Sequence, residues 1–164
     1  SNIEELKIEE FDLTKLINTI VNRFKIFSYT KSYQFILNNE EELIIKADKQ
    51  KMEQVIYNLI GNAINYTGKN KLIYINVLNN KKNIRVEIKD TGKGIKKKEI
   101  DKVWDKYYKS EKKYKRQTIG TGIGLSIVKN IFILHGFKYG IISKENEGST
   151  FWFEIPKVKK TESK

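Results

Sequence analysis

The chain has 164 residues, the size of one domain, and 39% of them are hydrophobic, which is enough for a buried core. The absence of cysteine excludes disulfides and thiolate metal sites, the single histidine excludes a multi-histidine metal cluster, and no apolar run reaches the ~18 residues of a membrane span. The net charge of +12 raises the question of nucleic-acid binding, although half of it comes from residues 96–118, with ten basic and four acidic side chains.

The first half of the chain predicts two helices among short strands. Asp12 and Asp48 are both placed as N-caps of helices that carry apolar residues at helical spacing. The expected elements are an edge strand over 6–11, a helix over 13–24, strands over 33–37 and 43–46 around an Asn-Asn turn, and a helix from 49 to about 66.

The second half predicts two hairpins and a third helix. The expected elements are strands over 72–78 and 84–88, a short amphipathic stretch over 100–108, a helix over 123–134 that stops at Gly136, and strands over 137–143 and 150–155. Because two hairpins exclude an all-parallel sheet, the predicted fold is a single α/β domain. It is a two-layer α/β sandwich in which three helices pack on one face of a mixed sheet. Residues 6–156 are expected to form the core, and 157–164 a frayed tail.

Three asparagines lie along one edge of the second predicted helix. Asn58, Asn62 and Asn65 fall within about 60° of each other, at the border of an apolar stripe that runs from Met52 to Ala63. Asparagine is a mediocre helix former, so three on one edge cost stability without improving the packing. They are either a solvated edge or a set of amide oxygens that hold a hard cation such as Mg²⁺.

Two glycine-rich turns are candidate ligand sites. Asp-Thr-Gly-Lys-Gly-Ile (90–95) directly follows a strand whose alternation turns Asp90 inward, where its carboxylate needs a donor. An adenine amino group and Thr150 are the candidate donors, and an ordinary turn is the alternative. Gly-Thr-Gly-Ile-Gly-Leu (120–125) opens the third helix, where free N–H groups predict an anion site. Its spacing fits neither a Walker A loop nor a Rossmann fingerprint.

Five segments together resemble a known set of motifs. They are Asn-Leu-Ile-Gly-Asn-Ala-Ile-Asn-Tyr (58–66), Asp-Thr-Gly-Lys-Gly-Ile (90–95), Val-Trp-Asp-Lys-Tyr-Tyr-Lys-Ser (103–110), Gly-Thr-Gly-Ile-Gly-Leu-Ser-Ile-Val-Lys (120–129) and Gly-Ser-Thr (148–150). In this order they resemble the N, G1, F, G2 and G3 boxes of the ATP-binding catalytic domain of bacterial sensor histidine kinases. The resemblance covers nearly the whole chain, from about residue 6 to 156.

The resemblance implies ATP and Mg²⁺ as cofactors and assigns roles by position. Asn62 corresponds to the Mg²⁺ ligand, Asn58 faces the phosphates, and Asp90 binds the adenine amino group. Residues 96–119 correspond to a mobile lid, whose Lys106 and Lys109 lie nearest the terminal phosphate. The other residues expected at the nucleotide are Tyr66, Gly92, Gly94, Ile95, Tyr107, Gly120, Thr121, Gly122, Gly124, Leu125 and Thr150.

Several positions depart from the family pattern. Asn65 stands where the family often has a basic residue, so one phosphate contact is missing. Lys109 stands where arginine is common, and it keeps the charge without the bidentate fork of arginine. Trp104 and Tyr107 replace phenylalanines of the F box, and Ile119 replaces a frequent glycine.

The residue four positions before Asn62 favours a phosphotransferase over a hydrolase. Related ATPases of gyrases, mismatch-repair proteins and a heat-shock chaperone carry a glutamate there, as anti-sigma-factor kinases usually do, whereas this chain has Asn58. An amide cannot act as a general base, and Glu53 lies about 180° around the helix from Asn62.

The resemblance also implies partners. The only histidine, His135, is expected to complement the dipole at the end of the third helix, so the phosphorylated histidine belongs to a dimerisation and phosphotransfer domain outside this chain. The expected partners are ATP, that domain and a cognate response regulator. The fragment is expected to be monomeric and cytoplasmic, within a homodimeric, membrane-anchored parent. A nucleic-acid-binding module is the rival; its affinity would fall steeply with salt and need no Mg²⁺.

Overall fold

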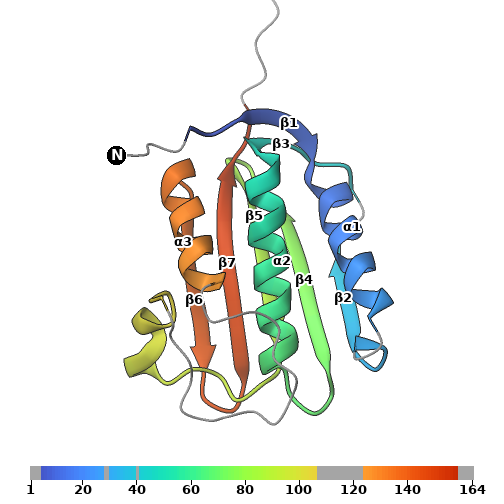
Figure 1. Ribbon diagram of the computed structural model, residues 1–164, viewed down its shortest axis with the longest axis vertical. Helices are drawn as coiled ribbons and strands as arrows, with labels where there is room; N and C mark the ends of the chain where they lie inside the picture. Colours follow the sequence, from blue (N-terminus) through green and yellow to red (C-terminus); the bar gives the residue numbers. More distant parts are fainter. Residues whose placement is uncertain (1–4, 28–29, 40, 107–123, 159–164) are drawn as a thin grey trace, which may run out of the picture.

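Helices form one layer and strands the other in this computed structural model, which describes residues 5–27, 30–39, 41–106 and 124–158 (Figure 1). The helices are α1 (Leu13–Ile26), α2 (Lys49–Tyr66) and α3 (Gly124–His135), with a 3₁₀ helix, η2 (Lys97–Lys102). The strands are β1 (Ile8–Asp12), β2 (Gln34–Asn38), β3 (Ile44–Asp48), β4 (Leu72–Asn79), β5 (Asn83–Asp90), β6 (Lys138–Lys144) and β7 (Gly148–Pro156). The predicted two-layer α/β sandwich is confirmed.

The larger sheet has five strands in the order β2-β4-β5-β7-β6. The β2–β4 pair is parallel and the other pairs are antiparallel, so the sheet is mixed as predicted. Both predicted hairpins are present, as β4–β5 and β6–β7. The first strand, β1, instead pairs with β3 in a separate two-stranded sheet that the sequence did not predict.

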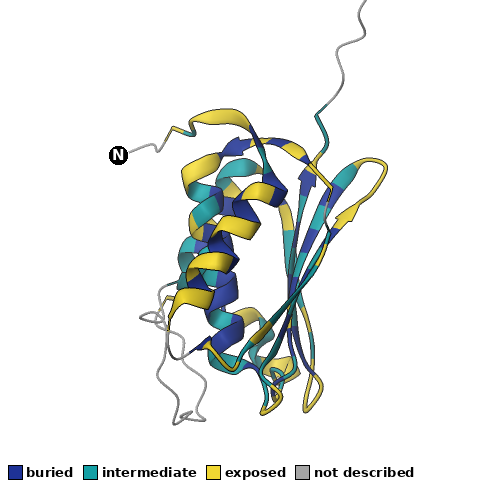
Figure 2. Ribbon diagram, turned by 90° about the vertical axis from the view of Figure 1, so that its right-hand side faces the viewer, coloured by how far each residue is buried: buried dark blue, intermediate teal, exposed yellow. Residues whose placement is uncertain are grey.

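The core lies between the two layers. Alternate side chains of the central strands point towards the helices and are buried, among them Ile75, Val86 and Phe153. The predicted apolar stripe of α2 is buried along its whole length: Met52, Val55, Ile56, Leu59, Ile60 and Ala63. The opposite face of the sheet carries no helix among the described residues (Figure 2).

The helix ends are those that the sequence predicts. The carboxylate of Asp12 accepts the backbone N–H of Thr14 at 2.9 Å, and that of Asp48 accepts the N–H of Lys51 at 3.1 Å. These bonds satisfy N–H groups that have no partner within the helix. The α3 helix ends at Gly136, whose φ of +70° suits glycine.

His135 ties the end of α3 to the start of α2. Its Nε2 accepts the backbone N–H of Asp48 at 3.1 Å, and its Nδ1 lies 2.8 Å from the carbonyl oxygen of Ile131. A ring nitrogen that accepts a hydrogen bond carries no proton, so this arrangement uses the neutral ring. The structural role is as predicted, but it depends on hydrogen bonds rather than on a positive charge at the helix end.

The segment after β5 is anchored to the sheet at its far end. The 3₁₀ turn of η2 leads to Val103 and Trp104, which are both buried. The Trp104 ring packs edge-on against Tyr139 and Phe151, with centroids 5.2 and 5.7 Å apart. The helical turn therefore begins before residue 100, and the described part of the predicted lid segment, 96–119, contains η2 and these two buried side chains. Residues 107–123 lie outside the described part of the chain.

Candidate functional site

The residues singled out in the sequence converge on one end of the helix pair α2–α3. These helices lie side by side and antiparallel, so the N-terminus of α3 meets the C-terminal half of α2 (Figure 1). A Cβ atom at Gly124 would lie 3.3 Å from the side-chain oxygen of Asn58. The predicted anion site at the start of α3 and the predicted asparagine edge of α2 are thus direct neighbours.

The asparagine edge has the donor chemistry that Mg²⁺ needs. Asn58 and Asn62 are half-buried and one helical turn apart, so their side chains lie on the same side of α2. Mg²⁺ takes oxygen ligands and completes its shell with waters and substrate phosphates, so one or two amide oxygens suffice. The described residues contain no cluster of three acidic or histidine side chains that offers another metal site. These residues fit the expected ion.

Asp90 is a buried carboxylate at the end of β5. Only 2% of its surface is exposed, and its Oδ1 accepts the backbone N–H of Gly92 at 2.9 Å. Burial raises the pKa of Asp90 to about 6, and the backbone N–H groups of Gly92 and Ser149 partly offset this effect. A carboxylate has about four acceptor positions, so two backbone donors leave capacity for an amino group of a ligand.

The turn after Asp90 needs its two glycines. A Cβ at Gly92 would lie 1.8 Å from the carbonyl oxygen of Tyr66, at the end of α2. Gly94 has a φ of +72°, and its Cβ would lie 2.2 Å from the carbonyl oxygen of Lys144. No other residue fits either position without moving the backbone. The turn is therefore packed between α2 and the β6–β7 hairpin.

Of the two candidate donors to Asp90, Thr150 is excluded by the strand register. In the β5–β7 ladder Thr150 pairs with Lys89, whereas Asp90 pairs with Ser149. Since neighbouring residues of a strand point to opposite faces, Thr150 lies on the face away from the helices. Ser149 is buried and shares the face of Asp90, and its backbone N–H is one of the donors to that carboxylate.

Two hydroxyl clusters around this turn were not expected from the sequence. The Thr67 and Thr91 hydroxyls are 3.2 Å apart, and Thr91 donates to the Asn70 side chain at 2.5 Å. On the other side, the Ser143 and Ser149 hydroxyls are 2.8 Å apart. Serine and threonine are too common for these to stand out in a sequence, and only the strand register brings them together.

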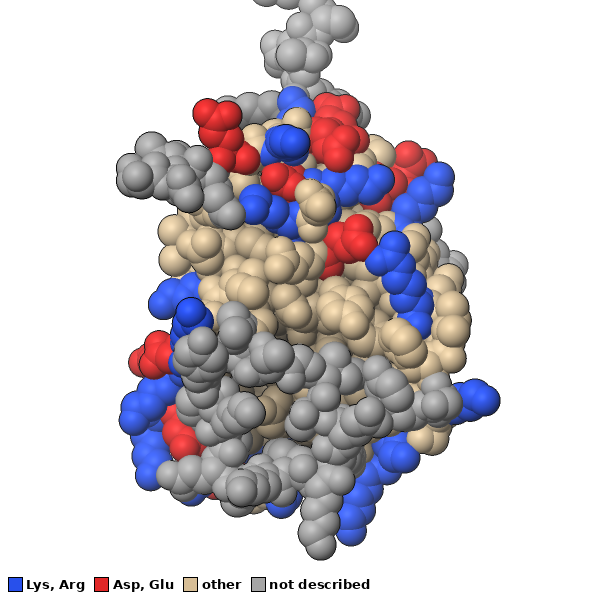
Figure 3. Space-filling model, in the orientation of Figure 1, with Lys and Arg blue, Asp and Glu red and all other residues tan. Residues whose placement is uncertain are grey.

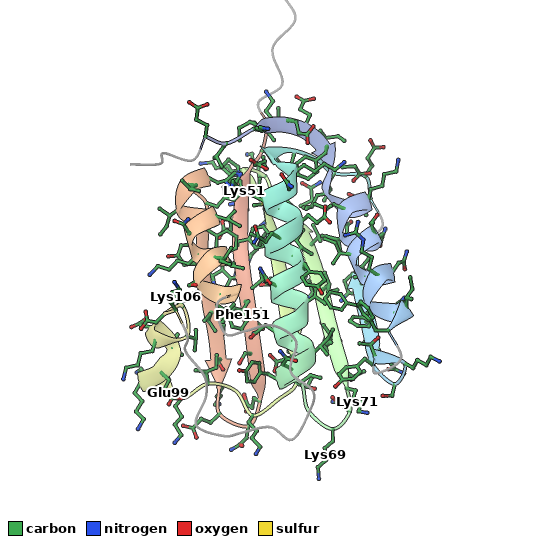
Figure 4. All side chains as sticks on the ribbon, in the orientation of Figure 1. Lys51, Lys69, Lys71, Glu99, Lys106 and Phe151 are labelled. Carbon is green, nitrogen blue, oxygen red and sulfur yellow. The ribbon has the colours of Figure 1, made fainter. Side chains whose placement is uncertain are left out.

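Lysines surround this end of the molecule. Figure 3 shows mainly basic side chains along the lower rim of the helix face and a mixture of basic and acidic ones at its upper end. Lys69 projects from the α2–β4 connection, and Lys106 lies on the other side, beside η2 and the start of α3 (Figure 4). Other exposed lysines of this end are Lys93, Lys96, Lys97 and Lys98. This distribution favours an anionic ligand.

Some of the remaining expected residues lie in the described part of the chain, and the others lie outside it. Ile95 and Leu125 are partly buried and pack against the core, and Ile95 also lines an open hollow between η2 and β6 together with Ile100 and Ile141. Tyr66 ends α2 directly above the Gly92 turn. The expected residues that lie outside the described part of the chain are Tyr107, Lys109, Gly120, Thr121 and Gly122.

A comparison with known families decides the affiliation. The family described as histidine kinase-, DNA gyrase B- and HSP90-like ATPase matches residues 47–159, which is well over half of the chain. The chain belongs to this family. The matched region begins just before α2 and contains the asparagine edge, the Asp90 turn and α3.

Sensor histidine kinases are among its most similar relatives. The chain is 32% identical over 151 residues to sensor histidine kinase WalK of Bacillus subtilis, which covers 90% of this chain and 24% of that protein. It is 32% identical over 156 residues to sensor protein kinase WalK of Staphylococcus aureus, covering 93% of this chain and 25% of that protein. The chain thus spans about a quarter of the length of these relatives.

Solved structures of histidine kinase catalytic domains resemble this chain. The catalytic domain of histidine kinase ThkA matches with a TM-score of 0.78 and 31% identity, over 93% of this chain and 99% of that domain. The chain therefore has the fold and the extent of a histidine kinase catalytic domain, as the five sequence motifs indicated. None of the described helices is long and apolar enough to cross a membrane.

Proposed function

We propose that the chain binds Mg-ATP and transfers the γ-phosphate to a histidine that lies outside it, as the catalytic domain of a sensor histidine kinase. The observation that carries this proposal is the buried carboxylate of Asp90, in a glycine turn beside the asparagine edge of α2 and the start of α3. A carboxylate that is buried, lacks a described salt-bridge partner and lies at a basic end of the molecule is poorly suited to structure alone.

The adenine base is recognised through its 6-amino group. In the proposed complex this group donates to the Asp90 carboxylate, which is held in place by the N–H groups of Gly92 and Ser149. Gly92 lets the turn pack against the carbonyl of Tyr66 at the end of α2, which keeps the Gly92 N–H directed at the carboxylate. Partly buried apolar residues such as Leu125 exclude water from the base.

The phosphates lie between α2 and α3 in this proposal. The positive end of the α3 helix dipole and the surrounding lysines favour negative charge there. Asn62, and Asn58 one turn earlier, are the residues that would hold Mg²⁺. When bound, Mg²⁺ supplies neutralisation of the charge on the phosphate oxygens.

The geometry of α2 favours phosphotransfer over hydrolysis. Asn58 occupies the position of a general base but has an amide that cannot accept a proton. The nearest glutamate on α2, Glu53, pairs with Arg23 of α1 at 2.5 Å, on the side of α2 that faces away from α3. Neither residue is suited to activate water for attack on the γ-phosphate.

The phosphate acceptor must come from elsewhere. His135 engages both ring nitrogens with backbone groups of Asp48 and Ile131, at the opposite end of α3 from the proposed nucleotide site. In the transfer, the bond from the γ-phosphorus to the bridging oxygen breaks, a bond to an imidazole nitrogen of the acceptor forms, and ADP leaves. Asn62, Asn58 and the lysines act by positioning and charge.

The partners of the whole protein follow from the same reasoning. The structure of histidine kinase ThkA has been solved in complex with the response regulator protein TrrA, and ThkA is 31% identical to this chain in the matched region. We extend this to a cognate response regulator for the protein that contains this chain, and to a phosphotransfer domain that presents the histidine. Membrane attachment of that protein is part of the proposal.

Thermal unfolding with nucleotide tests the site directly. ADP or an unhydrolysable ATP analogue at about one hundred times its dissociation constant is expected to add roughly 2.7 kcal/mol, or about 5–10 °C in midpoint for a domain of this size. The shift should be larger with Mg²⁺ than with EDTA. An unchanged midpoint with both nucleotides would exclude the proposed function.

Asn62→Ala tests the metal assignment within this site. The substitution should lower the Mg²⁺-dependent gain in ADP affinity by about tenfold, because one oxygen ligand is lost, while affinity in EDTA stays near the wild-type value. Isothermal titration in both buffers measures this. Asn130→Ala, an exposed asparagine of α3, is the matched control. Equal Mg²⁺ dependence in wild type and Asn62→Ala would refute Asn62 as the ligand.

A further inference from the structure

We propose that Ser143 of β6 is a positioning residue that holds the Asp90 turn in the shape that recognises adenine. The proposal rests on the proposed ATP site and adds a residue to it. Ser143 lies on neither α2, β5 nor α3, and no motif singled out in the sequence contains it.

The Ser143 hydroxyl makes all the hydrogen bonds that one hydroxyl can make. Its oxygen accepts the backbone N–H of Ile95 at 2.7 Å, and it donates to the carbonyl oxygen of Gly148 at 3.1 Å. The hydroxyl of Ser149 lies 2.8 Å away and completes the set as a second donor. One donor and two acceptor positions are thereby filled.

These partners surround Asp90 on both sides. Ile95 closes the turn whose Gly92 donates to the carboxylate, and Ser149 lies opposite Asp90 in the β5–β7 ladder. Gly148 packs against the backbone of Asp90, since a Cβ at Gly148 would lie 2.1 Å from the carbonyl oxygen of Asp90. Both backbone donors to the carboxylate are therefore linked to the Ser143 hydroxyl by short stretches of chain.

The turn is held to the hairpin at two points. Beside the Ser143 bond, the N–H of Asn146 donates to the carbonyl oxygen of Lys93 at 2.6 Å. Gly94 packs between these points, within van der Waals distance of the β6 backbone. Removing the hydroxyl leaves the Asn146 bond in place, so the turn stays attached but its Ile95 end is released. The consequence is a less well oriented carboxylate rather than an unfolded domain.

Base discrimination distinguishes this role from a general effect on stability. Isothermal titration compares ADP with purine riboside diphosphate, which lacks the 6-amino group. Wild-type protein should prefer ADP by about tenfold or more, as expected for a hydrogen bond to a carboxylate. Ser143→Ala should reduce this preference to about twofold, and Ser143→Thr should restore it because the hydroxyl is retained.

Thr14→Val is the matched control for lost stability. Its hydroxyl donates to the carbonyl oxygen of Glu41 at 2.5 Å, at the other end of the molecule, so its removal should lower the unfolding midpoint and leave the preference unchanged. If Ser143→Ala weakens the binding of both nucleotides equally, or of neither, the role of Ser143 is overturned while the adenine site stands. Wild-type protein that binds neither nucleotide, or both equally, would overturn the adenine site itself.

Discussion

Two buried aspartates at opposite ends of the helix layer differ in what surrounds them. Asp48 and Asp90 are 6% and 2% exposed, and each accepts two backbone N–H groups. Although desolvation opposes it, the N–H groups of Lys7 and Lys51, together with the charge of Lys51, lower the pKa of Asp48. For Asp90, desolvation dominates and raises the pKa to about 6.

The difference separates a structural carboxylate, Asp48, from the proposed ligand-binding carboxylate, Asp90. Asp48 caps α2 and holds the chain before β1 through Lys7, and its negative charge is stabilised by the fold. Asp90 is kept charged at neutral pH at a cost to the fold, which is typical of groups that meet their partner only in a complex. The comparison predicts opposite effects when each carboxylate is removed.

The largest expected effect is on nucleotide affinity at Asp90. In the proposed complex Asp90→Asn replaces the acceptor of the adenine amino group by an amide, and ADP affinity should fall by about a hundredfold, or about 2.7 kcal/mol. Isothermal titration at pH 7.5 measures the change. Asp101→Asn, on the exposed surface of η2, is the control and should bind as wild type does. An affinity within threefold of wild type (a change of about 0.7 kcal/mol) would mean that Asp90 does not contact the base.

The same substitution should stabilise the free protein. The folded pKa of Asp90, about 6, lies above the ordinary value of 3.8, so ionisation above pH 6 costs the folded state stability. Asp90→Asn removes this cost and should raise the free energy of unfolding by about 2 kcal/mol at pH 7.5. As pH falls from 6 to 4 the wild-type carboxyl takes up its proton and the gain should disappear. Urea unfolding across this range measures it, and a gain independent of pH would contradict the assigned cause.

Local patterns account for most of the fold that the sequence predicted. The caps at Asp12 and Asp48, the stripe of α2 and both hairpins depend on residues close together in the chain, and all are present. The β1–β3 sheet was missed because its two strands are separated by α1 and β2. A short alternating strand does not indicate its partner, since pairing over such a distance depends on packing of the whole domain.

In the candidate site, too, features that depend on local sequence were predicted, and features that depend on distant segments were not. Asp90 and its glycines were recognisable because strand alternation and turn chemistry are local. Ser149 was mistaken for Thr150 because β5 and β7 are distant in sequence, and a shift of one residue in their register exchanges the two faces. Ser143 gave no signal at all, since its role depends on three backbone segments that meet only in the folded chain.

The smallest expected effect is at Asp48, and its sign is opposite to that of Asp90. Asp48→Ala removes the N-cap of α2 and the acceptor for the Lys7 N–H, and it should lower the free energy of unfolding by about 1.5 kcal/mol. The lowered folded pKa means that this stability is present above the unfolded value near 3.8 and is lost as pH falls through the folded pKa. The deficit should therefore stay constant from pH 5 to 8, whereas the Asp90→Asn gain should shrink as pH falls from 6 to 4. Asp12→Ala, which removes the equivalent cap of α1, should also lower the free energy of unfolding, and ADP affinity should be unchanged in both variants. Weaker ADP binding in Asp48→Ala but not in Asp12→Ala would show that the two ends of the helix pair are coupled, and the separation of roles would then be wrong.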